Sequence, residues 1–474
     1  METLRKEPPA PSIPIKKASF PLPFTSGLEF NAPARGPWNI VHKALLIPAA
    51  HLIYVCARGC LRGVIMTAQE MGARHRLSWV GVSEEDLASG TIETTTFTSI
   101  CAILETLNPK PPLILLYLSC IHKFTNFDYA YLLDQLNAKY PDIYFVDCYM
   151  MPTMRKSGIT DEQRTYINMY QYLSSVKPTH FEPKSINFIA NDRPIDQDSI
   201  LIRTLQDNNY VIRDLCTCKT FEDYKDMAKS QYNLTIFEDA RYPAKYLEEH
   251  LRQIHLHVPL SYNEENIEAN FKKLSATLNL KFNQKDVAES YDQAIVALKD
   301  LAATLKDRPL ALDYTFTPKP LSLARLLVRH GMALKLLFID AFDPLEAADF
   351  AWLKENAPNL ILVPTLAPTE RFQPLRVATC RGLQVDEVLA LGQKAAYLTS
   401  TNYFVNLVLG GGYYDYSGIS KLCELIKEAH TTKKPLGSTI LHKGLGCTTC
   451  VDPSVLASLG RIQELEEKIS NFSS

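Results

Sequence analysis

The stretch HLIYVCARGCLRGVIMTAQEMGA, residues 51–73, decides the fold of this chain. Its first residues are almost all apolar, which is typical of a strand buried on both faces of a parallel sheet. A turn at Gly59 and an amphipathic stretch follow, so the segment predicts a strand, a turn and a helix. Cys56 and Cys60 flank the turn. Their sulfur atoms are either buried apolar filler or ligands that the turn presents.

The same alternation of apolar runs and amphipathic stretches recurs along the chain. It predicts an α/β protein with three Rossmann-like domains, each a parallel sheet with helices on both faces. The expected strands are 52–56, 76–82, 113–120, 143–148, 185–190, 210–216, 233–239, 310–315, 334–340 and 360–365. The expected helices include 126–140, 243–254, 263–280, 284–305 and 320–332.

A chain of 474 residues is too long for one hydrophobic core. Eight of its 29 prolines lie within the first 37 residues, which predicts an extended N-terminal arm over 1–37. The rhythm of the remaining chain predicts a first α/β domain over 38–182, a second over 183–306 and a third, with a C-terminal helix, over 307–474.

The composition excludes several classes of protein. Lys plus Arg (50) nearly balance Asp plus Glu (52), which gives no support to a nucleic-acid or membrane-surface partner. The charged, proline-broken N-terminus does not resemble a signal peptide, and no apolar run could cross a bilayer. We therefore expect a cytoplasmic protein, in which the 11 cysteines are core residues or metal ligands rather than disulfides.

Four cysteines follow or end predicted parallel strands: Cys56, Cys60, Cys120 and Cys148. Carboxyl ends of parallel strands meet at one edge of a sheet, so one crevice could gather them. Thiolates suit iron–sulfur clusters because sulfur is a soft donor. The helix that starts after Cys60 would turn its positive dipole end toward an anionic cluster. Burial as small apolar side chains is the alternative for each of them.

Several motifs together are similar to component 1 of nitrogenase, a family that includes light-independent protochlorophyllide reductases and a nickel-sirohydrochlorin reductase. They are Gly-Cys at the first helix start (59–60), SEEDLASG (83–90), LSC (118–120), DCYMMP (147–152) and GGGYYDYSGISKLCELI (410–426). The resemblance implies a [4Fe–4S] cluster held by Cys60 and Cys120 and by Cys56 as a substitute ligand. It leaves the fourth position to Cys148 or to a partner chain.

The resemblance also implies a homologous partner subunit, in a homo- or hetero-oligomer, and a separate ATP-hydrolysing iron–sulfur reductase. Two departures argue against dinitrogen reduction on an iron–molybdenum cofactor. The strand that should end in a cofactor-binding cysteine reads LTIFEDARYPAKYL (234–247), and the family's cofactor histidine aligns with Gly412. The family's first cluster cysteine is also missing from 31–46, where His42 is a weaker substitute than Cys56.

Four side chains are candidates for catalysis, because phenols and carboxylates can donate protons. Tyr414, Asp415 and Tyr416 follow a triple glycine, with Ser417 as a possible helix cap, and Glu238 follows a strand in FEDAR. Packing of the tyrosines against a neighbouring domain, and a helix cap formed by Asp239, are the respective alternatives.

The remaining candidates are weaker. They are a metal or redox pair at Cys447 and Cys450 preceded by His442, the pair Cys216 and Cys218, the basic pair Arg155 and Lys156, and His122 beside the proposed cluster; Cys101 and Cys423 are expected to be core residues. No P-loop, GxGxxG motif or Ser–His–Asp arrangement is present, so the chain itself is not expected to hydrolyse ATP.

The sequence thus predicts an iron–sulfur subunit of a nitrogenase-like oxidoreductase that passes low-potential electrons to a small-molecule substrate between domains. Whether a second metallocofactor binds is open. An assembly scaffold of the same fold without turnover, and a non-enzymatic α/β binding protein, are the alternatives.

Overall fold

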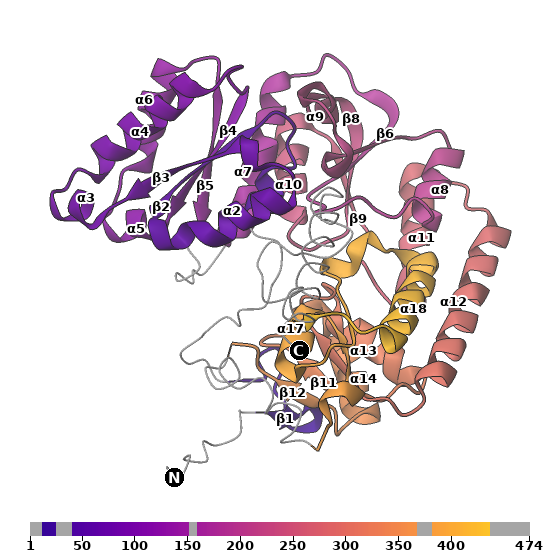
Figure 1. Ribbon diagram of the computed structural model, residues 1–474. Helices are drawn as coiled ribbons and strands as arrows, with labels where there is room; N and C mark the ends of the chain where they lie inside the picture. Colours follow the sequence, from indigo (N-terminus) through magenta and orange to yellow (C-terminus); the bar gives the residue numbers. More distant parts are fainter. Residues whose placement is uncertain (1–11, 25–39, 151–158, 367–381, 437–474) are drawn as a thin grey trace, which may run out of the picture. The chain divides into compact units, whose positions relative to one another are not determined.

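The computed structural model describes residues 12–24, 40–150, 159–366 and 382–436. The chain divides into two compact units (Figure 1). Within the described residues, the two-sheet unit comprises 40–150, 159–194 and 209–259, and the one-sheet unit comprises 12–24, 195–208, 260–366 and 382–436. Three sheets flanked by helices confirm the predicted α/β class. The three predicted domain boundaries stay a prediction.

The first sheet of the two-sheet unit is parallel throughout, in the order β3-β2-β4-β5. Its strands are β2 (His51–Ala57), β3 (Leu77–Val82), β4 (Leu113–Ser119) and β5 (Tyr144–Met150). Strand alternation sends Ile53 and Val55 into one core and Leu52, Tyr54 and Cys56 into another. This double burial explains why the strands are apolar at nearly every position.

Helices cover both faces of this sheet. The first core is closed by α4 (Ile92–Thr106) and α6 (Tyr129–Lys139), which lie side by side (Figure 1). The second is closed by α1 (Ile40–Ala44), α2 (Leu61–Glu70) and α7 (Asp161–Val176). Two short helices, α3 (Glu84–Ala88) and α5 (Cys120–Phe124), follow β3 and β4.

The second sheet of the same unit is also parallel, in the order β7-β6-β8-β9. Its elements are β6 (Glu182–Phe188), β7 (Val211–Asp214), α9 (Phe221–Asp226), β8 (Ser230–Thr235), α10 (Arg241–Leu251) and β9 (Ile254–His257). Helix α10 packs against α7, and one apolar cluster continues from the first sheet to the second. The two sheets therefore share a core.

The one-sheet unit has the strand order β1-β12-β11-β10-β13-β14, with only β1 antiparallel. Its strands are β1 (Ile13–Pro14), β10 (Leu310–Asp313), β11 (Leu334–Phe338), β12 (Ile361–Val363), β13 (Leu389–Leu391) and β14 (Phe404–Val405). Its helices are α8 (Ile200–Asp207), α11 (Glu264–Leu278), α12 (Gln284–Leu305), α13 (Pro320–Arg329), α14 (Ala347–Asn356), α17 (Gln393–Thr399) and α18 (Asp415–Thr431).

All ten predicted strands and the five named helices overlap observed elements. Strand β1 lies in the described part of the predicted arm and pairs with β12. The sequence patterns did not indicate β1, β9, β13 or β14, which have only two to four residues each. None of the helices in the described ranges is long and apolar enough to cross a membrane.

Each sheet has one place where the strand order reverses direction. The chain leaves the central strand toward one side and later returns to the other, so β2 lies beside β4, β6 beside β8 and β10 beside β13. Ligands of open parallel sheets bind beyond the carboxyl ends of such neighbouring strands, at the topological switch point. These three edges are therefore the places where a functional site is expected.

The switch point of the third sheet is closed by packing. Asp313, at the end of β10, is fully buried and accepts hydrogen bonds from the backbone N–H groups of Thr315 and Ala395, both at 2.7 Å. Gly392 follows β13 with a φ of +109°, and a Cβ placed there would lie 2.2 Å from Oδ2 of Asp313. Only glycine fits this approach.

We expect Gly392→Ala to lower the free energy of unfolding by roughly 2–4 kcal/mol, because it combines left-handed backbone with a clash against a buried carboxyl group. Urea unfolding measures the change. The matched control is Gly331→Ala, since Gly331 has a φ of +79° but nothing within 4 Å of its Cβ position. That control should lose only about 1 kcal/mol. Equal losses in both variants would contradict the clash.

Candidate functional site

The thiols of Cys60 and Cys120 lie at the switch point of the first sheet, in the two-sheet unit. Cys60 follows β2 and immediately precedes α2, and its side chain is exposed. Cys120 follows β4 as the first residue of α5 and is half-buried. Partial burial raises the pKa of the Cys60 thiol, and the nearby charge of Cys120 raises it further. Both cysteines thus lie beyond the carboxyl ends of the neighbouring strands β2 and β4.

A buried phenol lies among the thiols. Tyr54 is 1% exposed and lies on β2 two residues before Cys56, on the same face of the strand. Burial raises the pKa of Tyr54, and the charges of Cys56, Cys60 and Cys120 add to this effect. The sequence reasoning missed this tyrosine.

Cys56 and Cys148 occupy different positions from those predicted. β2 continues to Ala57 and β5 to Met150, so neither cysteine lies in a loop or ends its strand. Both are fully buried in the apolar core, because strand alternation points them inward. Burial raises the pKa of Cys56 to about 12 and that of Cys148 well above its ordinary value. This environment favours packing; their role as cluster ligands stays a prediction.

Cys148 interacts with a different group of side chains. The backbone N–H of Cys148 donates to the Tyr129 hydroxyl at 3.2 Å. Burial is the main cause of the raised pKa of the Cys148 thiol, and the charge of Asp147 is the next. Tyr117, its neighbour across the sheet, interacts with it. Neither Cys60 nor Cys120 contributes to the pKa of Cys148.

The donors present fit part of an iron–sulfur site. Cys60 and Cys120 are soft, reachable thiols, and the Oγ of buried Ser119 has no hydrogen-bond partner among the described residues. In those same ranges, no three His, Cys, Asp or Glu side chains are grouped so that they could hold a metal ion. The described chain therefore offers two thiolates at this edge, and a four-iron cluster would need further ligands.

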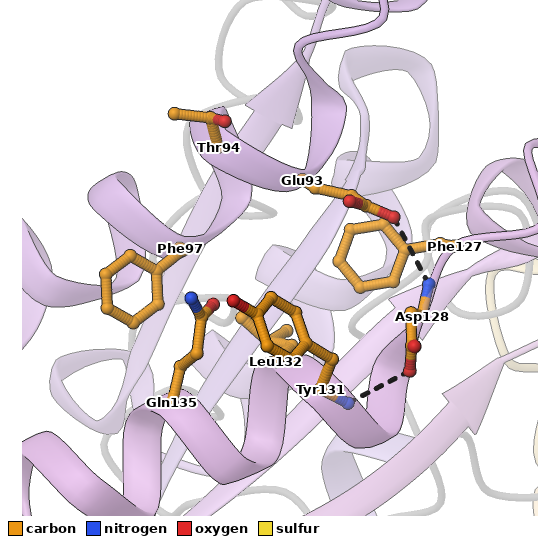
Figure 2. A pocket seen from close by; sticks show the side chains of 8 residues that line it. All are labelled: Glu93, Thr94, Phe97, Phe127, Asp128, Tyr131, Leu132 and Gln135. Atoms are coloured by element: carbon orange, nitrogen blue, oxygen red, sulfur yellow. Dashed lines mark hydrogen bonds between the residues drawn. The ribbon is translucent and has the colours of Figure 1, made fainter.

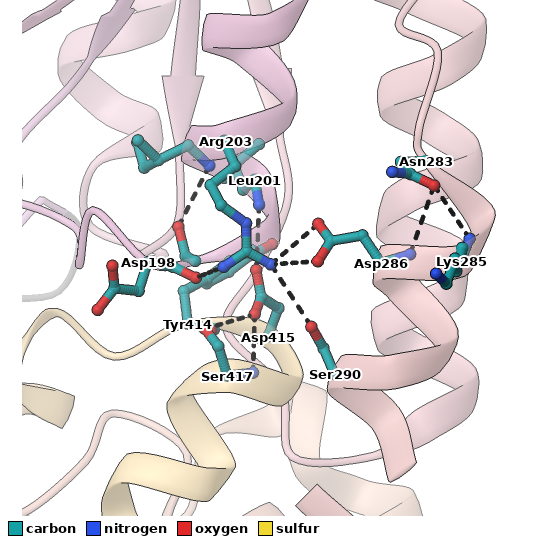
Figure 3. Close-up of polar contacts among 12 residues, drawn as sticks. Asp198, Leu201, Arg203, Asn283, Lys285, Asp286, Ser290, Tyr414, Asp415 and Ser417 are labelled. Atoms are coloured by element: carbon teal, nitrogen blue, oxygen red, sulfur yellow. Dashed lines mark hydrogen bonds and ion pairs between the residues drawn. The ribbon is translucent and has the colours of Figure 1, made fainter. Parts of the chain in front are cut away.

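The Tyr-Asp-Tyr segment is packed within the one-sheet unit (Figure 3). Asp415 is 3% exposed and accepts hydrogen bonds from the N–H of Leu201 at 3.1 Å and of Ser417 at 3.0 Å. It thus joins the start of α18 to the first turn of α8. The prediction that Ser417 caps the helix is wrong, because its hydroxyl donates to Asp415 at 3.0 Å within the helix.

The two tyrosines beside Asp415 are buried as well. The hydroxyl of Tyr414 accepts a hydrogen bond from Nδ2 of Asn270 at 3.1 Å, and the ring of Tyr416 packs edge-on against Tyr291 and Phe271. Burial raises the pKa of both phenols. The contacts of Tyr414 and Tyr416 named here stabilise the packing of the unit. The catalytic role of the two tyrosines stays a prediction.

Glu238 lies in the two-sheet unit, beyond the carboxyl end of β8. Its Oε1 pairs with Nε2 of His257 at 2.9 Å, and its Oε2 pairs with Arg241 at 3.1 Å. The prediction that the neighbouring Asp239 caps a helix is wrong, because α10 has no side-chain cap at its N-terminus. Asp239 instead accepts a hydrogen bond from Gln163 at 2.7 Å.

The sequence reasoning missed a buried charged cluster at the switch point of the second sheet. Lys43 contacts Glu162 and lies 4.0 Å from Asp192, which accepts a 2.6 Å hydrogen bond from the hydroxyl of Tyr166. Burial opposes the charged form of Lys43, but the carboxylates outweigh it and raise its pKa. The polar triplet Asn-Asp-Arg (191–193) that follows the predicted strand 185–190 was the available signal.

The other sequence candidates divide as follows. His122 is buried, and burial lowers its pKa to about 4, so the ring is neutral at pH 7. Cys101 and Cys423 are core residues, as predicted. Cys216 and Cys218 are half-buried thiols with raised pKa values. The last candidates lie outside the described residues: Arg155, Lys156, His442, Cys447 and Cys450.

A surface hollow of about 280 Å³ opens between the start of α4 and the start of α6 (Figure 2). Phe97, Phe127 and Tyr131 line it, with Glu93 and Asp128 at its edge. The two acidic groups already interact locally: Glu93 accepts the N–H of Asp128 at 3.4 Å, and Asp128 caps α6 through the N–H of Tyr131. We assign no role to this hollow.

Comparison with solved structures shows which known proteins share this fold. Two solved structures share the fold: "Nitrogenase Cp1 at pH 6.5", with 15% identity, a TM-score of 0.62 and coverage of 86% of this chain and 94% of that one, and "Nitrogenase Cp1 at pH 5", with 12% identity, a TM-score of 0.54 and coverage of 86% and 90%. A search of curated proteins found no match.

The family follows from the sequence itself. The family model described as nitrogenase component 1 type oxidoreductase matches residues 43–371, which is more than half of the chain. The chain therefore belongs to the nitrogenase component 1 type oxidoreductase family, as the motifs predicted.

Asp415 gives a test of the packed motif. Burial raises its pKa to about 7, so between pH 4 and 7 the folded state holds a proton that the unfolded state releases. The stability of the wild type relative to Asp415→Asn should therefore fall by on the order of a few kcal/mol as the pH rises through this window. Urea unfolding at pH 4.5, 6 and 7.5 measures it.

Asp198 supplies a control of opposite sign. This exposed carboxylate pairs with Lys421, which lowers its pKa. Its contribution is present above the ordinary pKa of an aspartate and is lost as the pH falls through the lowered value. Asp198→Asn should therefore show no change between pH 6 and 7.5, and a change there as large as that of Asp415→Asn would contradict the assignment.

Proposed function

We propose that this chain is an iron–sulfur subunit of a nitrogenase-like oxidoreductase. It accepts low-potential electrons from an ATP-hydrolysing iron–sulfur reductase and passes them to a small-molecule substrate other than dinitrogen. The observation that carries the proposal is the position of two free thiols, Cys60 and Cys120, just beyond the ends of the adjacent strands β2 and β4. Family membership supports the reaction class.

The pair of thiolates would hold one side of a [4Fe–4S] cluster. When bound, such a cluster stores and releases single electrons at low potential. The exposure of Cys60 leaves its sulfur reachable from outside the chain, so a homologous partner subunit can supply the remaining ligands. Cys56 is the alternative third ligand, but its sulfur would have to leave the apolar core.

The neighbouring backbone would favour an anionic cluster over bulk ions. Cys60 precedes the ten-residue helix α2, whose first N–H groups and positive dipole end lie next to its sulfur. The buried, mostly apolar strands β2 and β4 would exclude water from that side of the site. The chain's own contribution is thus to position the sulfur ligands and to limit solvent access.

An assembly scaffold of the same fold is the second candidate. The side chains of Tyr414 and Asp415, which were expected to donate protons, are instead bound in packing and hydrogen bonds. A scaffold would hold a cluster without needing proton donors. Oxidation of the reduced protein by substrate, in the presence of the reductase and ATP, separates the enzyme from the scaffold.

We expect anaerobically purified protein to contain iron and to give an EPR signal after reduction with dithionite. Cys60→Ala and Cys120→Ala should each abolish or alter that signal, because each removes a thiolate ligand. Cys101→Ala and Cys423→Ala are matched controls, since both thiols are buried in helices α4 and α18. They should keep the signal. Iron-free wild-type protein after anaerobic reconstitution would overturn the proposal.

A further inference from the structure

We propose that His255, Thr235 and His257 form a proton relay that ends at Glu238, beyond the carboxyl end of β8. The use of the relay rests on the proposed function, because the reduction of a substrate by single electrons also consumes protons. The relay supplies protons to this edge of the second sheet. It thereby adds three side chains to Glu238, which the sequence had indicated as a candidate.

A continuous row of hydrogen bonds connects the four side chains. Oγ1 of Thr235 lies 2.8 Å from Nε2 of His255 and 2.9 Å from Nδ1 of His257. The other ring nitrogen of His257, Nε2, lies 2.9 Å from Oε1 of Glu238. Each distance is that of an ordinary hydrogen bond. A proton can therefore pass from atom to atom along the row.

The pairing of two parallel strands produces this row. Thr235 and His257 are cross-strand partners, and each is the last residue of its strand, β8 or β9. His255 lies two residues before His257 and therefore shares its face of the sheet. Glu238 follows three residues after β8. The row thus runs from within β9 to the carboxyl edge, where parallel sheets bind their ligands.

The single proton of the Thr235 hydroxyl couples the two imidazoles. Thr235 is fully buried, and within the described residues its hydroxyl hydrogen-bonds these two rings and no other group. If the oxygen accepted a hydrogen bond from both rings, its own proton would be buried without an acceptor, which is costly. The hydroxyl therefore donates to one imidazole and accepts from the other.

The charged groups beside the relay lie at its Glu238 end. Strand β8 contains no charged residue, and β9 contains only the two histidines as titratable groups. Asp239 follows Glu238, and Arg241 at the start of α10 pairs with Oε2 of Glu238 at 3.1 Å. A carboxylate only accepts hydrogen bonds, so Nε2 of His257 carries a proton at rest and Nδ1 does not. The hydroxyl then donates to His257 and accepts from Nε2–H of His255.

The transfer balances without any movement of electrons. A proton enters at Nδ1 of His255, which is half-buried, and the proton on its Nε2 passes to the oxygen of Thr235. The hydroxyl proton passes to Nδ1 of His257, and the proton on Nε2 of His257 passes to Oε1 of Glu238. One proton enters and one arrives. Both imidazoles then hold their proton on Nδ1, so the tautomer of His255 reports the transfer.

The experiment is nitrogen NMR of the full chain labelled with ¹⁵N-histidine, between pH 8.5 and pH 5. His255→Gln and His257→Gln assign the two rings. We expect both imidazoles to carry a proton on Nε2 at the highest pH. As the pH falls, His257 should gain a proton on Nδ1 while His255 changes to the neutral Nδ1–H tautomer, because the carboxylate of Glu238 draws the added charge to its end of the relay.

Two results in the wild type contradict the relay. One is a His255 ring that becomes a cation before His257 gains its proton. The other is a His255 ring that keeps its proton on Nε2 and stays neutral over the whole pH range. Neither measurement needs a cluster, so protein that binds no iron refutes the proposed function and leaves the NMR result to decide on the relay.

Variants of Thr235 test the hydroxyl itself. Thr235→Val should abolish the tautomer change of His255, whereas Thr235→Ser keeps the hydroxyl and should retain the change. The matched control is Thr179→Val, since Oγ1 of Thr179 contacts Nδ1 of His180 at 3.1 Å on the surface. That control should leave His255 as in the wild type. A tautomer change that persists in folded Thr235→Val contradicts the relay; if thermal unfolding shows that this variant is not folded, the wild type and Thr235→Ser decide.

Discussion

The adjacency of β2 and β4 is the constraint on which the candidate site depends. Six pairs of residues hold β2 against β3 and five hold it against β4, all in parallel register. Because the chain departs to one side of β2 and returns on the other, two strand ends that are some 60 residues apart in sequence meet at one corner. This topology, rather than any local spacing, places Cys60 and Cys120 beyond neighbouring strand ends.

The three switch points of the protein are used in three ways. The first presents thiols, of which Cys60 is exposed. The second holds the buried Lys43, whose charge is balanced by buried Asp192 and by exposed Glu162. The third is filled, since the carboxyl group of Asp313 and the bare backbone of Gly392 leave no room between them. The same type of switch point thus presents thiols in the first sheet, holds charged side chains in the second and is filled by packing in the third.

Much of the fold could be predicted because its signals are local. Long buried strands such as 113–119 and long amphipathic helices such as 284–305 carry their periodicity in one continuous segment. The shortest strands, such as β14, have only two residues and no period to detect. For the site, the apolar runs correctly predicted that Cys60 and Cys120 lie just beyond the ends of strands. Tyr54 was missed because an apolar strand with one phenol looks like any core strand.

The sequence by itself determined the α/β class, the family and the two cysteines that follow adjacent strands, because these depend on composition, periodicity and short motifs. Only the tertiary structure decided which of the four thiols can be reached. Cys56 and Cys148 lie inside strands, where alternation turns their sulfur atoms into the core. Likewise, the hydrogen bond from Leu201 of α8 to Asp415 joins residues that are 214 positions apart. Burial and long-range contact are properties of the folded chain, which no local pattern records.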